Sequence, residues 1–84
     1  MDTKKIYTII IITENKPGVL YRIADIFLKR KINIESLSVS ETEKKGLSQF
    51  TILIKTEKEI LEKVLRQIGK IIEVVKVFEA KGGE

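Results

Sequence analysis

Residues 6–30 read IYTIIIITENKPGVLYRIADIFLKR and join a strand pattern directly to a helix pattern. Residues 6–13 are mostly β-branched and are apolar at both odd and even positions. This pattern predicts a strand that is apolar on both faces. Pro17 suits the first turn of a helix, and Gly18 lets another group approach the backbone closely. From Val19 the apolar residues recur at helical spacing, so the stretch predicts a strand, a sharp turn and a helix.

The rest of the chain continues the same two patterns. In chain order we expect a strand over 32–40, a hairpin loop over 41–46, a strand over 47–55, a helix over 56–68 and a strand over 71–79. In the strand over 32–40, the apolar residues change from even to odd positions near Glu35, which predicts a β-bulge. Thr56 and Glu59 have the spacing of a capping box at the start of the second helix.

The resulting order of elements is βαββαβ. Two strand–helix–strand crossovers joined by a hairpin predict an α+β, ferredoxin-like sandwich, with a four-stranded antiparallel sheet and both helices on one face. No linker interrupts the pattern, so we expect one domain over 1–80 and a frayed tail over 81–84.

The composition excludes several classes of function. The 84 residues contain no histidine and no cysteine, which removes the Ser-His-Asp triad, thiol nucleophiles, disulfides and ordinary zinc sites. A chain this short does not readily build a deep cleft alone, so we expect an oligomer. The net charge is only +4, and basic and acidic residues are interleaved along the chain. The sequence has no apolar run long enough to span a bilayer and no signal-peptide pattern. These features predict a cytoplasmic protein that binds neither nucleic acid nor membrane.

The two predicted helices differ in the width of their apolar stripes. The second helix has a stripe of about 140°, which one contact with a sheet can cover, whereas the stripe of the first helix is about 200° wide. Its core-facing members are Leu20, Ile23, Ala24, Phe27 and Leu28, and its outer members are Val19 and Ile26. Part-exposed apolar residues are common on any surface, but the first strand is also apolar on both faces. We therefore favour a second contact, with another subunit.

The loop between the first strand and the first helix has the features of a ligand site. The first N–H groups of a helix lack partners within the helix and carry the positive end of its dipole, which favours a carboxylate. Asn15 adds a side-chain amide, Gly18 permits close approach, and Asn33 opens the second strand just after the helix. Each of these residues also has a common structural role in a turn or cap, and N-x-P-G alone is a weak motif.

Two segments taken together are more specific. T-E-N-K-P-G-V-L-x-R-I over residues 13–23 is followed, after a helix, by I-N-I-E-S-L-S-V over residues 32–39. This combination resembles the ACT domain, a small amino-acid-sensing module. More narrowly, it resembles the regulatory (small) subunits of acetolactate synthase, also called acetohydroxyacid synthase. The resemblance covers residues 5–79 and includes E-V-V-K-V near the end.

The resemblance implies a regulatory subunit with no catalytic residues, no metal and no cofactor of its own, whose partner is the catalytic, thiamine-diphosphate-dependent large subunit. It also implies a homodimer with an eight-stranded sheet, at whose interface a branched-chain amino acid, usually valine, binds. By position, the effector-binding residues are Asn15, Pro17, Gly18, Val19, Leu20, Asn33 and Ile34, and the dimer-interface residues are Val19, Ile23, Ile26, Ile34 and Leu37. Occupancy would bias the dimer and thereby impose feedback inhibition on the large subunit.

Several alternatives stay open at this point. Many members of this family carry a second domain after the ACT domain, whereas this sequence ends at Glu84, so activation of the large subunit does not follow from the resemblance. An RNA-binding module of the RRM type has Tyr7 and Phe50 as candidate stacking residues, although residues 47–55 lack its signature. An acylphosphatase-like hydrolase would need a basic, Gly-rich anion cradle that residues 14–18 do not supply. An ACT-type assembly domain without a ligand is a further alternative.

Overall fold

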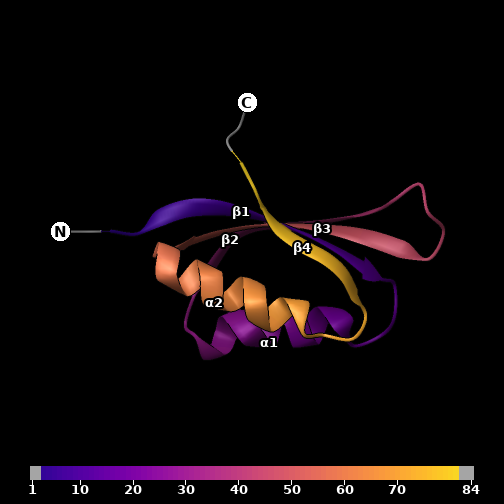
Figure 1. The fold of residues 1–84 in the computed structure, drawn as a ribbon, viewed down its shortest axis with the longest axis horizontal. Coiled ribbons are helices and arrows are strands. Elements are labelled where there is room, and N and C mark those ends of the chain that lie inside the picture. The colour runs from indigo at the N-terminus through magenta and orange to yellow at the C-terminus, as the bar shows by residue number, and fades with distance from the viewer. Residues whose placement is uncertain (1–2, 82–84) are drawn as a thin grey trace.

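Residues 3–81 form six elements in the predicted βαββαβ order (Figure 1). The computed structural model describes residues 3–81, so the predicted tail lies outside the described residues except for Lys81. The elements are β1 (Lys5–Glu14), α1 (Val19–Lys29), β2 (Asn33–Glu41), β3 (Leu47–Thr56), α2 (Lys58–Gly69) and β4 (Val74–Ala80). Among the described residues, no helix is long and apolar enough to cross a membrane.

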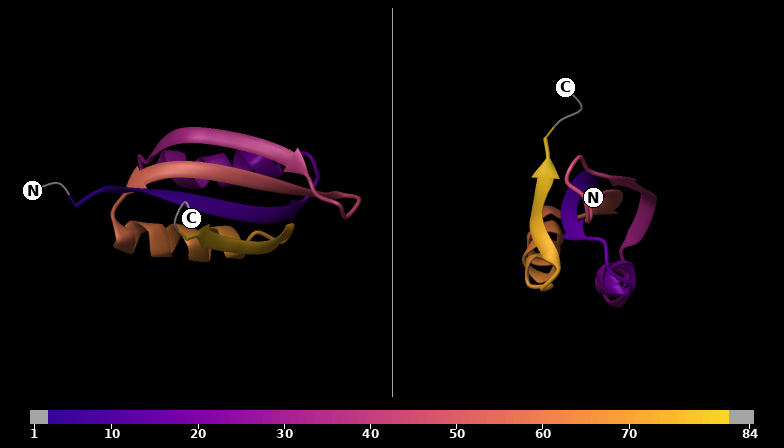
Figure 2. Two further views of the ribbon diagram at one scale, coloured as in Figure 1. Left: turned by 90° about the horizontal axis from the view of Figure 1, so that it is seen from above. Right: turned by 90° about the vertical axis from the view of Figure 1, so that its right-hand side faces the viewer.

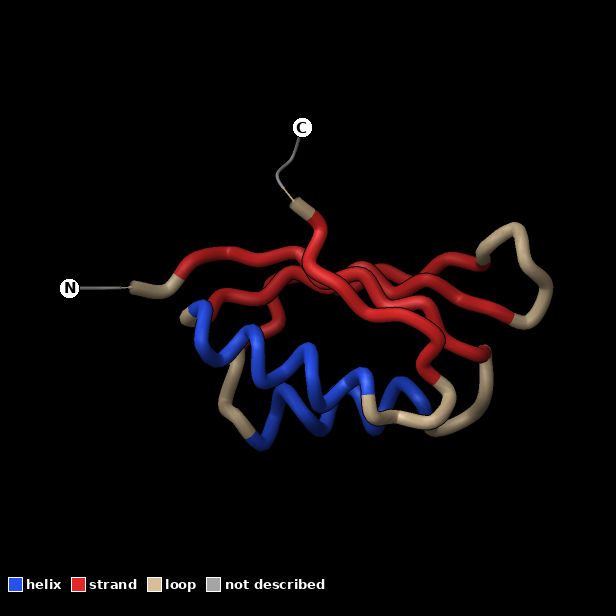
Figure 3. The backbone as a smooth tube through the Cα atoms, viewed as in Figure 1, coloured by secondary structure: helices blue, strands red, loops and turns tan. Residues whose placement is uncertain are grey.

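The sheet has the strand order β2-β3-β1-β4, and every neighbouring pair is antiparallel. Both helices lie on one face of the sheet, with α1 on the β2 side and α2 on the β4 side (Figures 2 and 3). The two central strands pair along their whole length, from Lys5 opposite Thr56 to Glu14 opposite Leu47. This architecture is the ferredoxin-like sandwich that the sequence predicts.

Strand β1 carries apolar residues on both faces, as predicted. Ile9 and Ile11 face the helices and are fully buried, whereas Ile10 and Ile12 face the other side and are partly exposed. On that side Ile10 lies opposite Phe78 of β4, which is 39% exposed. Because both helices lie on the opposite face (Figure 2), this side of the sheet stays half-exposed in the single chain.

Helix α1 buries Ile23 and Phe27 as the sequence predicts, but its buried face is shifted from the predicted one toward Val19. Its buried residues are Val19, Ile23 and Phe27. Leu20 and Leu28, which we expected to face the core, are 40% and 71% exposed. The helix packs against both the sheet and α2, so its buried line follows the four-residue spacing from Val19 to Phe27. The pattern of apolar residues on a helical wheel does not by itself fix where that line falls.

This assignment of faces predicts unequal effects of two neighbouring substitutions. We expect Phe27→Ala to lower the free energy of unfolding by about 3–5 kcal/mol, because it removes a fully buried ring and leaves a cavity. We expect Leu28→Ala to change the free energy of unfolding of the monomeric chain by less than about 0.5 kcal/mol, because this side chain is exposed there. Urea unfolding of both variants measures the difference, and similar losses would show that the helix faces are wrongly assigned.

Strand β2 lies at the edge of the sheet, and all of its 9 residues are exposed. Its register with β3 shifts between Ile34 and Ser36, so Glu35 is the extra residue of the predicted β-bulge. After the bulge, Leu37 and Val39 share a face with Ile34, and all three lie opposite core residues of β3. Ile34 is nevertheless 38% exposed, Leu37 44% and Val39 52%, because α1 covers this edge of the sheet only in part.

Two predicted boundaries are wrong. Thr56 is the last residue of β3 and is buried, so Glu57 is the N-cap of α2, and no side chain of the described residues caps that helix start. The predicted capping box does not form, because pairing with β1 extends β3 by one residue and turns Thr56 toward the core. Strand β4 begins at Val74, because residues 70–73 form the turn that leaves α2.

Candidate functional site

The loop between β1 and α1 holds the first group of predicted site residues. Asn15 and Pro17 are exposed, and Gly18 is the N-cap of α1 with a left-handed φ of 89°. Glycine adopts this backbone conformation without the strain that a Cβ would bring. Apart from its chain neighbours, no described heavy atom lies within 4 Å of the position that a Cβ at Gly18 would take. The space beside the start of the helix is therefore open to a ligand.

The first turn of α1 offers backbone N–H groups to that space. The N–H of Arg22 donates to the carbonyl of Gly18 at 3.1 Å. Within residues 3–81, the N–H groups of Leu20 and Tyr21 have no backbone acceptor, and no side chain caps the helix. The first turn also contains no acidic residue that would offset the helix dipole. This arrangement favours an anionic group, such as a carboxylate, at the start of α1.

Backbone hydrogen bonds tie the entry of this loop to two distant segments. The N–H of Glu14 donates to the carbonyl of Glu73 at 3.0 Å, and the N–H of Asn15 donates to the carbonyl of Gly46 at 2.9 Å. Glu73 lies in the turn before β4, and Gly46 lies in the β2–β3 hairpin, which projects from the same end of the molecule as the loop (Figures 1 and 3). The loop is thus held by segments far from it in the sequence.

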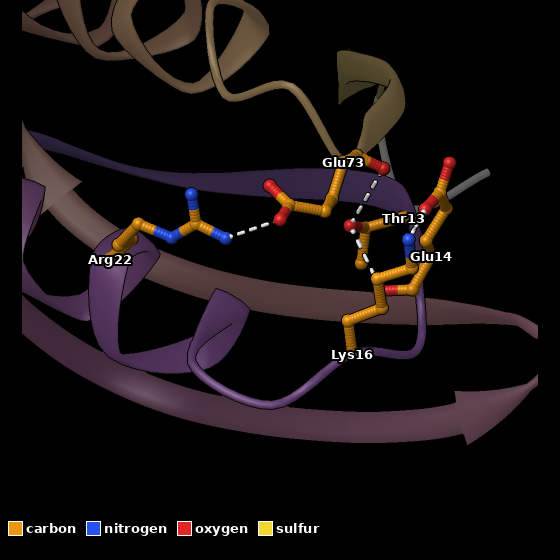
Figure 4. Close-up of polar contacts among 5 residues, drawn as sticks. All are labelled: Thr13, Glu14, Lys16, Arg22 and Glu73. Atoms are coloured by element: carbon orange, nitrogen blue, oxygen red, sulfur yellow. Dashed lines mark hydrogen bonds and ion pairs between the residues drawn. The ribbon is translucent and has the colours of Figure 1, made fainter.

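An ion pair fixes the start of α1 to the same corner (Figure 4). Arg22 Nη2 lies 2.7 Å from Glu73 Oε2, and the Glu73 side chain is 16% exposed. The hydrogen bond from the Arg22 guanidinium lowers the pKa of the Glu73 carboxyl, Lys16 adds a weaker attraction, and burial acts in the opposite direction. A lowered pKa keeps this carboxylate ionised at neutral pH, so the pair with Arg22 is intact there.

The second group of predicted site residues lies at the far end of α1. Asn33 and Ile34 open β2, and both are exposed. Helix α1 has 11 residues, which corresponds to a length of about 16 Å. One chain therefore does not bring Asn33 together with Gly18, and the two groups of site residues stay apart.

The predicted interface residues divide into exposed and buried members. Ile34 and Leu37 are exposed on β2, and Ile26 is partly buried on α1. Val19 and Ile23 are 2% and 0% exposed and pack inside the single chain. Their side chains already belong to the core, so the surface of α1 that can meet another chain is formed by its other apolar residues. At the loop, Val19 can offer a ligand only its backbone.

Three residues that hold the loop in place were missed by sequence reasoning. These residues are Thr13, Arg22 and Glu73. Thr13 had a usable signal, because it is a polar residue at a core-facing position of an apolar strand, and a buried hydroxyl needs a partner. No local signal marks Glu73, which lies 60 residues after Thr13.

The two aromatic residues considered for RNA stacking lie on the wrong face. Phe50 is 6% exposed and faces the helices, and Tyr7 packs against the same core. Stacking with single-stranded bases requires aromatic rings on an open surface of the sheet. The RNA-binding alternative therefore loses the residues on which it depended.

Comparison with known proteins places this geometry in a family. The family model of the acetohydroxyacid synthase (AHAS) small subunit-like ACT domain matches residues 9–76. This chain belongs to that family. It is 47% identical over 73 residues to a probable acetolactate synthase small subunit of Archaeoglobus fulgidus, and 43% identical over 77 residues to the acetolactate synthase small subunit of Mycobacterium avium. These alignments cover 87% and 92% of this ACT domain and 46% of each relative.

Solved structures agree with this assignment. The crystal structure of the acetolactate synthase small subunit from Thermotoga maritima matches with a TM-score of 0.84 at 34% identity, over 94% of this chain and 49% of that one. The chain thus spans about half the length of the small subunits that it matches. The ACT domain of the GTP pyrophosphokinase of Chlorobium tepidum matches with a TM-score of 0.78 over 96% of this chain and 91% of that one. At 21% identity, that likeness shows the fold alone.

Proposed function

We propose that this ACT domain binds a branched-chain amino acid, with valine as the first candidate, in a site shared by two copies of the chain. We further propose that binding controls the catalytic large subunit of acetolactate synthase, which carries the thiamine-diphosphate chemistry. The regulatory role is supported by the family model and by relatives that are small subunits of that enzyme. On this proposal the chain itself is not catalytic.

The proposal depends above all on the separation of the two groups of site residues along α1. Asn15 and Gly18 lie just before the helix, and Asn33 lies just after it. In a two-fold symmetric pair with antiparallel α1 helices, the start of one helix lies beside the end of the other. Such a pair would join the loop of each copy to Asn33 of the other copy and so form two identical sites.

The exposed edge of β2 supports the same pairing. The free N–H and C=O groups of an edge strand readily pair with another chain. Leu37 and Val39 are 44% and 52% exposed on the helix side of this strand. Pairing of β2 with its symmetry mate would create an eight-stranded sheet and remove these apolar side chains from water.

Each part of an amino acid would find a complementary group in the shared site. The carboxylate would accept hydrogen bonds from the unpaired N–H groups at the start of α1. The side-chain oxygens of Asn15 and Asn33 would accept hydrogen bonds from the ammonium group. Leu20 and Ile34, which are 40% and 38% exposed, would contact the aliphatic side chain. One methylene in such a pocket is worth about 1–3 kcal/mol of binding free energy, so valine, leucine and isoleucine should differ in affinity.

Thermal unfolding in the presence of amino acids tests this function. We expect at least one of L-valine, L-leucine and L-isoleucine to raise the Tm at millimolar concentration. A ligand that binds only the native state adds about 2.7 kcal/mol of stability at about 100 times its Kd. D-valine is the matched control, because it has the same groups and charges in the wrong arrangement. The absence of a shift with all three L-amino acids would contradict the proposed function.

A further inference from the structure

We propose that Glu73 is a positioning residue that sets the β1–α1 loop against the start of α1 and thereby determines the affinity for the amino-acid effector. This inference rests on the proposed function. Glu73 lies outside the predicted site and acts through its contacts with Thr13, Glu14 and Arg22, not through contact with the ligand.

The backbone of Glu73 holds the point where the chain enters the loop. Its carbonyl accepts a hydrogen bond from the Thr13 hydroxyl at 3.1 Å (Figure 4) and another from the Glu14 N–H at 3.0 Å. Thr13 is fully buried, so its hydroxyl is shielded from competing water. The end of β1 is therefore fixed to the turn before β4.

The side chain of Glu73 holds the element that leaves the loop. Figure 4 shows the Arg22 guanidinium extending from α1 toward the Glu73 carboxylate, with 2.7 Å between Nη2 and Oε2. Arg22 is also the residue whose N–H closes the first turn of the helix onto Gly18. Glu73 thus contacts the chain both before and after the loop. The distance between β1 and the first turn of α1 depends on these contacts.

The Arg22–Glu73 ion pair differs from the Lys29–Asp25 ion pair, which also involves helix α1. The Lys29–Asp25 pair has side chains that are 78% and 54% exposed, whereas those of Arg22 and Glu73 are 48% and 16% exposed. Exposed pairs of the first kind contribute little to stability, because water screens them and their side chains lose entropy. Lys29–Asp25 is also intrahelical, whereas Arg22–Glu73 joins two elements. The Lys29–Asp25 pair is therefore the control for loss of an ion pair from α1 that does not hold the loop.

The second carboxylate oxygen of Glu73 points to a role beyond stability. Within the described part of the chain, Oε1 is buried and has no hydrogen-bond partner. A buried acceptor without a donor is unfavourable, and such exceptions in native structures call for an explanation. The geometry supports one explanation: the carboxylate is oriented so that Oε2 contacts Arg22, and this orientation leaves Oε1 without a donor.

Loss of the carboxylate should lower effector affinity by loosening the loop. If the free N–H groups at the start of α1 are correctly placed in only about one tenth of the molecules, the apparent Kd rises about tenfold. We expect this rise in Glu73→Gln, which keeps the backbone contacts and the side-chain shape. Amide hydrogen exchange of Arg22 should be faster in this variant, with or without ligand. Asp25→Asn should change neither the exchange rates nor the Kd.

Calorimetric titration with L-valine and hydrogen exchange on the same samples decide the question. Arg22→Gln removes the same ion pair from its more exposed partner, and the double variant should bind no more weakly than Glu73→Gln alone, because both substitutions remove one interaction. Unchanged exchange and unchanged Kd in Glu73→Gln would overturn the inference, as would equal losses in Asp25→Asn. If the unaltered chain binds none of the three amino acids, the proposed function fails, whereas the ligand-free exchange still reports on the loop.

Discussion

We expect Gly18→Asp to abolish binding of branched-chain amino acids. The new carboxylate would occupy the open space beside the start of α1, where the ligand carboxylate is expected to lie. Two like charges about 4 Å apart repel by about 4 kcal/mol in a site of intermediate polarity, which corresponds to a loss of affinity of more than about 100-fold. Calorimetric titration with L-valine measures the loss directly.

Gly18→Ala separates this charge effect from backbone strain. Both substitutions place a side chain at a φ of 89°, which aspartate tolerates better than alanine does. We therefore expect Gly18→Ala to be the less stable of the two variants and yet to retain some binding of L-valine. An undiminished valine response in Gly18→Asp would mean that the site lies elsewhere.

The second large effect is expected at the edge of the sheet. Leu37→Glu should yield a monomer that no longer responds to branched-chain amino acids. The side chain is 44% exposed in the single chain, so glutamate is tolerated there by the fold. In the proposed dimer, however, it would be an uncompensated buried charge, which costs about 3–5 kcal/mol and weakens association by more than about 100-fold. Light scattering gives the mass, and thermal shift gives the amino-acid response.

Ser38→Glu is the matched control for this prediction. Ser38 is the next residue of the same strand and lies opposite Thr51, so it faces the side of the sheet without helices. The variant carries the same added charge on the other face, and we expect it to stay dimeric and responsive. If Leu37→Glu were still a dimer with a full valine response, β2 would not be the pairing edge.

The regular elements and their order were predictable because each depends on local pattern. Apolar residues on both parities predicted the central strand over 6–13, and the change of parity near Glu35 predicted a bulge that the register of β2 confirms. The errors occurred where tertiary contacts override local pattern. Thr56 has good capping chemistry, but pairing with β1 draws it into the sheet. The wide apolar stripe of α1 did not reveal that Val19 belongs to its buried line.

The candidate site was predictable only in part, for a different physical reason. Gly18 and the unpaired N–H groups of the first helical turn follow from the order of strand, proline, glycine and helix. Glu73 does not, because its role arises from a contact that the fold makes between the turn before β4 and the start of α1. A single sequence contains no periodicity that links these two segments.

The most direct test of a site shared between two copies is a titration of mixed variants. Gly18→Asp disables the loop half of the site and Asn33→Ala disables the other half, so neither variant alone should bind L-valine. In a dimer with one chain of each kind, one site carries both substitutions and the other site carries none. We predict that subunit exchange between the two variants restores calorimetrically detected valine binding. A mixture that binds no more valine than either variant alone would contradict the shared site.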